Sequence, residues 1–211
     1  LAAETAIGKN PIACASMIVK LIRSYEAGNK MTPEDYISDP ASLLIEPHGG
    51  KLIRNEVPDV STDDIASLHR VCVSDHVLMD CQQIGIGTFS PLAGFMGKEE
   101  LDSVIHKYCL PDGTVWPLPI TLQLDEESLQ GCGVGDQIAL QSKEGKIHAL
   151  INISEIFACD IDSLSVPWFG TDSTLHPGVT RLINGGKYFV AGEVTLVERL
   201  STPFREFELT P

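Results

Sequence analysis

The apolar positions near the start of the chain follow a helical period. Ile12, Ala15, Met17, Val19, Leu21 and Ile22 form an apolar stripe with imperfect helical periodicity. Pro11 suits a first helical turn, where its missing N–H removes no hydrogen bond, and Gly28–Asn29 is a stop signal. This pattern predicts one amphipathic helix over residues 11–26.

The pattern changes after this helix. A polar stretch with two prolines predicts a linker over residues 31–42, with one short helical turn at Pro33–Tyr36 capped by Thr32. From Leu43 onward, prolines and glycines recur at short intervals, and the segments between them are rich in β-formers. We therefore divide the chain into residues 1–30, 31–42 and 43–211.

Short apolar segments in the third part alternate with a period of two. They predict strands over Trp116–Leu124, Gln137–Gln141, Lys146–Phe157 and Tyr188–Leu200. The sequence SKEGK joins the second and third of these, and its glycine predicts a hairpin turn. The prolines in WPLPITLQL place the first strand near an edge or a bulge. In the third strand, Ile147, Ala149, Ile151 and Ile153 share one face, while His148, Asn152 and Ser154 share the other.

Two helices are predicted among these strands. Asp75–Ile84 and Lys98–Tyr108 both carry an apolar stripe. Few parallel crossovers are expected, so the pattern favours an α+β fold that is mainly β. We expect a small barrel or folded sheet with peripheral helices, rather than a doubly wound sheet.

Composition and charge exclude some classes of function. The chain has 211 residues, and 15 Lys and Arg against 29 Asp and Glu give a net charge of −14. This charge, with no run of Lys or Arg, argues against nucleic acid as a partner. No stretch approaches the length of a membrane span, and the N-terminus LAAETAIGKNP shows no charged-then-apolar signal-peptide pattern, so we expect a cytoplasmic protein without membrane contact. The chain begins with Leu1 rather than Met, which predicts a fragment.

The six cysteines show no metal or disulfide pattern. They are Cys14, Cys72, Cys81, Cys109, Cys132 and Cys159. None forms C-x-x-C, and none has a histidine at zinc-ligand spacing. We expect reduced, mostly buried thiols and no metal site.

No self-sufficient catalytic pattern emerges from the remaining polar residues. Gly85 and Gly87 lack the third glycine of a dinucleotide fingerprint, so they predict a loop turn. The six histidines, His48, His69, His76, His106, His148 and His176, include no helical zinc pair. His48 and His176 precede glycine or proline turns, and Ser90 precedes Pro91, which favours structural roles for all three. The acidic pairs Asp63–Asp64 and Glu126–Glu127 predict helix starts. We therefore name no catalytic, cofactor-binding or metal residue.

Five ordered motifs in residues 43–211 carry a family resemblance. They are EPHGGKL at 46–52, GTFSPLAGFM at 87–96, LPDGTVWPLPITL at 110–122, FGTDSTLHPGV at 169–179 and GGKYFVAGEVTLVE at 185–198. Together they resemble the N-terminal domain of ATP sulfurylase (sulfate adenylyltransferase). The resemblance implies a PUA-like pseudo-barrel with peripheral helices.

The resemblance also implies roles for particular residues. Turns would be fixed by Pro91, Gly94, Pro117, Pro119, Pro177 and Gly178. The core would contain Phe89, Leu92, Phe95, Met96, Trp116, Leu118 and Ile120. The family makes adenosine 5′-phosphosulfate and pyrophosphate from ATP and sulfate, with catalytic motifs in a following domain. Its Q-T-R-N-P-x-H-x-x-H motif is not in this sequence, so we expect a structural module that partners a downstream catalytic domain. ATP with Mg²⁺ would belong to the parent enzyme, and a homo-oligomer is expected.

The start of the chain carries a second resemblance. ETAIGKNP at 4–11, within residues 1–27, is similar to the E-T-A-x-G-x-x-P segment of the last barrel strand and helix of pyruvate kinase. This implies a fusion with a pyruvate-kinase-like part upstream. Two alternatives remain open: an RNA-binding PUA-like module, and a regulatory remnant of a pyruvate kinase that binds a phosphorylated effector.

Overall fold

The computed structural model describes residues 45–58, 60 and 65–211. The predicted helix over 11–26, the linker over 31–42, Cys14 and Asp63–Asp64 lie outside these residues. The chain divides into two units, Leu1–Pro47 and His48–Pro211, and the description below concerns the second. Among the described residues, no helix is long and apolar enough to cross a membrane.

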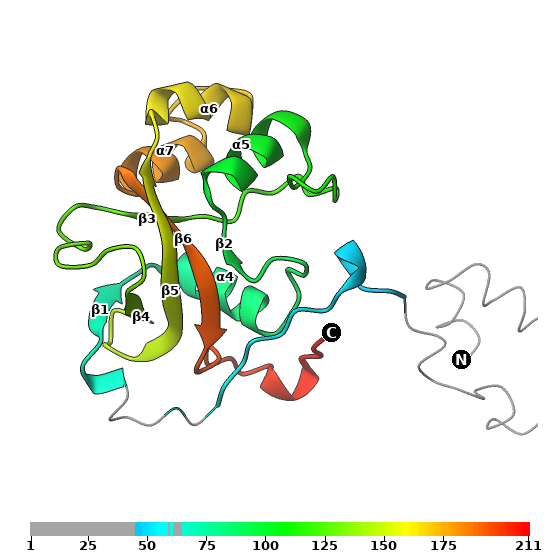
Figure 1. Cartoon of the computed structure of the whole chain (residues 1–211), viewed down its shortest axis with the longest axis vertical. Coiled ribbons are helices and arrows are strands. Elements are labelled where there is room, and N and C mark those ends of the chain that lie inside the picture. The colour runs from blue at the N-terminus through cyan, green and yellow to red at the C-terminus, as the bar shows by residue number, and fades with distance from the viewer. Residues whose placement is uncertain (1–44, 59, 61–64) are drawn as a thin grey trace, which may run out of the picture. The chain divides into compact units, whose positions relative to one another are not determined.

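The second unit contains six strands and four α-helices within the described residues (Figure 1). The strands are β1 (His69–Cys72), β2 (Gly94–Phe95), β3 (Leu122–Leu124), β4 (Gln137–Gln141), β5 (Ile147–Ala158) and β6 (Tyr188–Leu196). The α-helices are α4 (Asp75–Gly85), α5 (Lys98–Lys107), α6 (Ile161–Phe169) and α7 (Pro177–Asn184), and two 3₁₀ turns lie at His48–Gly50 and Arg205–Phe207.

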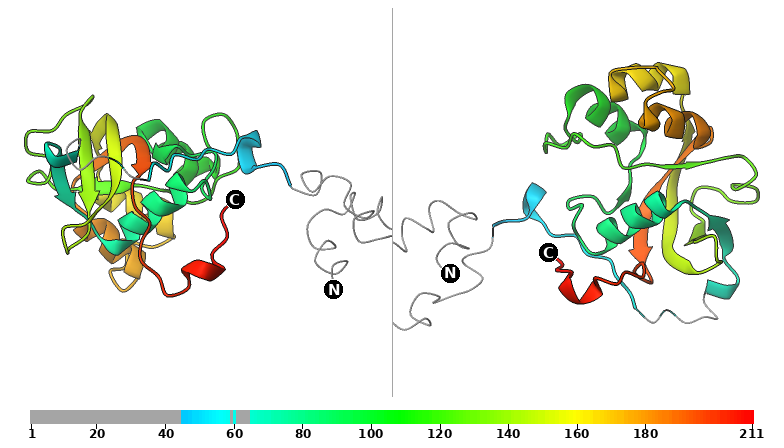
Figure 2. Two further views of the ribbon diagram at one scale, coloured as in Figure 1. Left: turned by 90° about the horizontal axis from the view of Figure 1, so that it is seen from below. Right: turned by 180° about the vertical axis from the view of Figure 1, so that it is seen from behind.

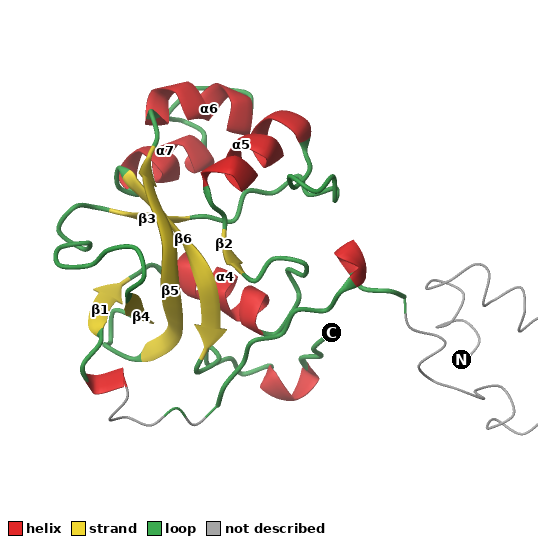
Figure 3. Ribbon diagram, in the orientation of Figure 1, coloured by secondary structure: helices red, strands yellow, loops and turns green. Residues whose placement is uncertain are grey.

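The strands form one mixed sheet. Its order is β1-β4-β5-β6-β2, and β3 pairs with β6 beside this path. The β1–β4 pair is parallel and the other strand pairs are antiparallel. The sheet therefore confirms the predicted α+β class. Figure 3 shows α5, α6 and α7 at one end of the long β5–β6 pair and α4 near its other end.

A β-bulge in β5 lets this strand serve two cores. Ile153 pairs with Gly192 and Glu155 pairs with Ala191, so Ser154 has no partner residue. The extra residue reverses the alternation of β5 relative to β6. Before the bulge, Ile153 faces the larger core. After it, Phe157 turns to the opposite face and stacks on Phe189, with 5.4 Å between the ring centroids, in a smaller core under α5, α6 and α7.

Close backbone contacts fix the positions of β2 and β6. A Cβ on Gly94 would lie 1.8 Å from the carbonyl oxygen of Gly192, and one on Gly192 would lie 2.0 Å from that of Asn152. No other residue type fits at these positions without moving a strand. Gly94 was expected at a turn, but it lies within β2, where it permits this approach.

A short segment before β1 runs along the end of the sheet and holds the two ends of the domain together. Val57 N donates to Leu196 O, Leu196 N donates to Asn55 O, and Asn55 N donates to Gly85 O, all at 2.9 Å. The Arg199 guanidinium reaches both carboxylate oxygens of Glu56. We call residues 53–57 the clamp. Figure 2 shows it passing beside the C-terminal segment.

Several predicted elements match their observed bounds closely, and others do not. β4, β5, α4 and α5 agree with prediction to within one residue at each end. The strand predicted over Trp116–Leu124 is only Leu122–Leu124, because Pro117 and Pro119 have no N–H for a ladder. The strand predicted to reach Leu200 ends at Leu196, because Val197 N and Glu198 N both turn to His148 O.

The expected core is also largely correct. Leu92, Phe95, Met96, Trp116 and Ile120 are buried. Phe89 is partly buried against them, whereas Leu118 is 54% exposed and lies outside the core. Pro177 and Gly178, which were expected at a turn, form the first residues of α7.

Candidate functional site

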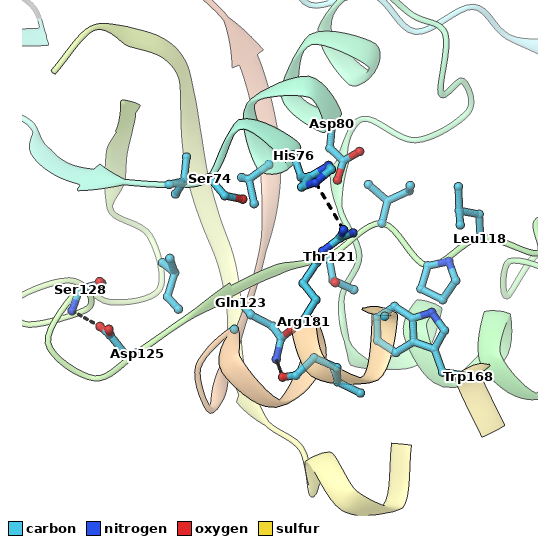
Figure 4. Close-up of a pocket in the computed structure, with 18 of the residues that line it drawn as sticks. Ser74, His76, Asp80, Leu118, Thr121, Gln123, Asp125, Ser128, Trp168 and Arg181 are labelled. Atoms are coloured by element: carbon cyan, nitrogen blue, oxygen red, sulfur yellow. Dashed lines mark hydrogen bonds between the residues drawn. The ribbon is translucent and has the colours of Figure 1, made fainter. Parts of the chain in front are cut away.

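A cavity of about 480 Å³ lies between α4, α7, the end of α6 and the extended segment that leads into β3 (Figure 4). The first turns of α4 contribute His76 and Asp80, and α7 contributes Arg181. These elements are far apart in sequence, and the sheet brings them together. The cavity combines charged groups with an apolar wall, which is the usual composition of a small-molecule site.

His76 and Arg181 join α4 to α7 across the cavity. Arg181 Nη2 lies 3.3 Å from His76 Nε2. A guanidinium has only donors, so Arg181 donates and His76 accepts.

Asp80 lies one turn after His76 and also faces the cavity (Figure 4). Burial raises the pKa of this carboxyl to about 6, against the opposing charges of His76 and Arg181. Among the described residues, its carboxylate accepts no hydrogen bond and forms no ion pair within 4.0 Å. Asp80 is thus a partly buried carboxyl that lies near the Arg181 guanidinium without forming an ion pair with it.

The opposite side of the cavity is apolar and aromatic. Trp168 and Phe169 at the end of α6 stack with 5.2 Å between their ring centroids, and Leu118 and Pro119 line the same side. Gln123 binds the C-terminal end of α7: its Nε2 donates to Leu182 O and Gly186 O, both at 3.1 Å. The Gln123 contacts hold the end of α7 beside the cavity, while Trp168 and Phe169 pack against the smaller core.

The groups that line the cavity suit the binding of a small molecule. Among the residues that the structure describes, no three His, Cys, Asp or Glu side chains form a group that could hold a metal ion. Ser74 lines the cavity, but none of the described hydrogen bonds joins its hydroxyl to His76 or another base. A donor-rich arginine, an acceptor carboxylate and an apolar wall can orient a small polar molecule.

The other histidines lie apart from this cavity. His48 bonds Val115 O at 2.6 Å, His69 bonds Ser128 O at 2.9 Å, and buried His148 bonds Glu198 O at 3.0 Å. His176 caps α7 by accepting from Gly178 N at 3.2 Å, which confirms its expected bond to local backbone. The bond of His48 is to backbone as well, but to a distant segment.

Ser90 and the glycine loop also have structural roles. Ser90 Oγ donates to Gly87 O at 2.6 Å and accepts from Ile53 N at 2.9 Å, so it ties the loop to the clamp. Gly87 has a φ of 93° and lies in a turn, as expected. Glu126–Glu127 lie in a turn, and the expected helix start is wrong, because Asp125 Oδ1 accepts from Ser128 N and holds a short loop.

The cysteines are less buried than expected. Of the five described, Cys81 is fully buried, Cys72 is exposed, and Cys109, Cys132 and Cys159 are intermediate. All five are free thiols. Burial raises the pKa of the Cys81 thiol, so this thiol is unreactive.

Sequence reasoning missed the cavity residues for an identifiable reason. His76 and Asp80 have the i, i+4 spacing that places two side chains on one helix face. That spacing was available in the predicted helix over Asp75–Ile84. Arg181 lies on α7, for which no helix was predicted, so nothing indicated that it would approach them.

Comparison with known proteins agrees with this architecture. The family described as a PUA-like domain matches residues 45–199. Sulfate adenylyltransferase from Symbiobacterium thermophilum is 35% identical over 171 residues, 79% of this chain and 44% of that enzyme. The probable bifunctional SAT/APS kinase 2 from Sorangium cellulosum is 32% identical over 80% of this chain and 30% of its own.

A solved structure shows the same fold. Hexameric APS kinase from Thiobacillus denitrificans superposes with a TM-score of 0.59 at 26% identity, covering 79% of this chain and 30% of that one. The chain therefore spans less than half the length of these relatives. The matched region includes the clamp, all six strands and α4–α7. The chain belongs to the PUA-like domain family, and its relatives include sulfate adenylyltransferases.

Proposed function

We propose that this chain is a non-catalytic structural module of a sulfate adenylyltransferase. The relatives with that name share 30–35% identity with it over most of its length. The supporting observation within the chain is its construction: a mixed sheet with two cores, closed by the clamp. The sequence also lacks the Q-T-R-N-P-x-H-x-x-H motif of the family.

In this proposal the module braces a catalytic domain of the same protein. That domain would bind ATP with Mg²⁺ and sulfate, and it would form adenosine 5′-phosphosulfate and pyrophosphate. No residue of the present chain is assigned to that chemistry. We also propose a homo-oligomeric parent protein, supported by the hexameric description of the solved relative.

A chimeric enzyme tests this function. Residues 45–199 of this chain replace the matched segment of the Symbiobacterium thermophilum sulfate adenylyltransferase, and sulfate-dependent exchange of pyrophosphate into ATP is measured. We expect exchange by the chimera and none by the 211-residue chain alone. A matched chimera with Val194→Asp should lose exchange, because Val194 is fully buried in the larger core.

Two results would contradict the proposal. One is exchange catalysed by the 211-residue chain without another domain. The other is a chimera that is folded by circular dichroism and thermal melting but does not exchange. A salt-sensitive mobility shift with structured RNA would instead support the RNA-binding alternative, which the net charge of −14 disfavours.

For the start of the chain we propose an origin in a pyruvate-kinase-like segment. The support is the E-T-A-x-G-x-x-P pattern at residues 4–11. The natural reading frame upstream of Leu1 provides the test. It should encode further barrel strands and helices of that family, and an unrelated upstream sequence would refute the proposal.

A further inference from the structure

We propose that the cavity between α4, α6 and α7 binds a small zwitterionic α-amino acid with an apolar side chain. The inference does not depend on the function proposed above, because it rests on the charges and walls of the cavity alone. A ligand of this class carries one positive group, one negative group and an apolar body. The cavity presents a partner for each.

The two charged partners lie close together but do not pair with each other. Asp80 and Arg181 both point into the cavity (Figure 4). Among the described ion pairs, none joins them within 4.0 Å, and the only described hydrogen bond of the Arg181 side chain goes to His76. Arg181 therefore keeps free donors for a carboxylate. Asp80 keeps free acceptors for an ammonium group.

The apolar partner lies beside these charges. Leu118 from the segment before β3 and Trp168 from α6 lie on one side of the cavity (Figure 4), and Pro119 also lines it. Leu118 is 54% exposed, so its side chain is accessible to an apolar group of a ligand in the cavity. An apolar side chain that extends from the charged end would cover Leu118 and the face of Trp168.

The balance of charge favours a zwitterion over a simple anion. The titratable groups that line the cavity are Cys72, His76, Asp80, Asp125 and Arg181. At neutral pH they include two carboxylates and one guanidinium, because the hydrogen bond of Asp125 to Ser128 N lowers its pKa and Asp80 titrates below 7. An anion alone would meet net repulsion. An amine alone would leave Arg181 without a partner.

Calorimetric titration of the 211-residue chain with matched ligands tests the proposal. The ligands are L-leucine, 4-methylpentanoate, which lacks the ammonium group, and 3-methylbutylamine, which lacks the carboxylate. We expect saturable binding of L-leucine at pH 7 and a loss of about tenfold or more in affinity for either analogue. Absence of L-leucine binding would overturn the proposal. Binding of either analogue with equal affinity would also overturn it.

Isosteric variants locate the site. Asp80→Asn and Arg181→Gln should each weaken L-leucine binding by about tenfold or more, since each removes one charged contact. The matched controls are Asp75→Asn on the same helix and Arg70→Gln on β1, neither of which lines the cavity. Thermal melting verifies that all four variants fold. Unchanged binding in folded Asp80→Asn and Arg181→Gln would place the ligand elsewhere and refute the proposal.

The pH dependence separates a zwitterion from an anion. Protonation of Asp80 as the pH falls through about 6 removes the partner of the ammonium group, so L-leucine should bind more weakly at pH 5 than at pH 7. Arg181 is the cation facing Asp80, and it becomes more favourable to anions as Asp80 is neutralised. Tighter binding of L-leucine at pH 5 would therefore contradict the assignment and indicate recognition of the carboxylate alone.

Discussion

At the scale of single residues, the Glu56 carboxylate of the clamp is held by two arginines. Its side chain is 16% exposed, and Arg199 binds both of its oxygens while Arg54 donates at 3.0 Å. The hydrogen bond from Arg199 is the main cause that lowers the pKa of Glu56 from 4.5 to about 2. The ionised form therefore stabilises the fold, and this contribution is lost as the pH falls from about 4.5 to about 2.

The substitution Glu56→Gln tests this contribution. We expect the free energy of unfolding at pH 7 to fall by about 2 kcal/mol. The difference from wild type should disappear near pH 2, as urea unfolding at several pH values would show. Glu208→Gln is the control, because the Arg205–Glu208 pair is more exposed and should contribute only about 0.3 kcal/mol. Equal effects of the two variants would contradict the role given to the clamp.

The pH dependence of stability that comes from Asp80 is opposite in sign to that from Glu56. Its pKa is raised from 3.8 to about 6, so the unfolded chain releases this proton before the folded one. Stability therefore falls as the pH rises from about 4 to about 6, and the loss persists above that range. We expect Asp80→Asn to be more stable than wild type at pH 7, by about 1–2 kcal/mol, and equal to it near pH 3.5.

Chemical unfolding at the two pH values measures this difference. A less stable Asp80→Asn protein at pH 7 would show that the carboxylate stabilises the fold through Arg181. The expected gain in stability of Asp80→Asn would instead indicate that the Asp80 carboxylate lowers the stability of the fold, as residues of binding sites often do.

At the scale of secondary structure, the contact of β2 with β6 depends on Gly94. A Cβ there would meet backbone atoms of Gly192, and backbone cannot move aside as a flexible side chain can. We expect Gly94→Ala to lower the free energy of unfolding by about 3 kcal/mol or more. Thermal melting measures the loss.

Gly133→Ala is the matched control for this substitution. A Cβ on Gly133 would have its nearest neighbour at 3.9 Å, and its backbone requires no positive φ. Its effect should stay within about 0.5 kcal/mol. A melting temperature of Gly94→Ala close to that of this control would show that β2 can separate from β6 without loss of the fold.

The same elements show what the sequence could and could not predict. β4 and β5 were predicted because their alternation is clear and a glycine turn joins them. α6 was missed because Pro167 interrupts a short, mostly apolar segment, and α7 was missed because it has only eight residues and begins with Pro177–Gly178. The bulge at Ser154 was also missed, since it is defined by the register with β6 and not by local pattern.

At the scale of the whole molecule, the family resemblance predicted the architecture but not the cavity. Motifs such as GTFSPLAGFM fix turns and core residues, and the matched region 45–199 confirms the fold that they implied. The cavity depends on α4 and α7 coming together in the fold, which no local pattern encodes. The i, i+4 spacing of His76 and Asp80 was visible in the predicted helix, but only the tertiary fold brings Arg181 to His76.

The clamp has a mechanical consequence. Glu56 and Leu196 form a parallel bridge, and the two segments exchange backbone hydrogen bonds on either side of it. Tension that enters through residues before 53 and leaves through residues after 199 pulls these parallel segments in opposite directions along their length. The bonds are then loaded together in shear rather than broken one after another. If neighbouring parts of a longer polypeptide pulled on this domain, the force would act first on the hydrogen bonds between the clamp and β6. β4, β5 and the cavity would be loaded only after these bonds break.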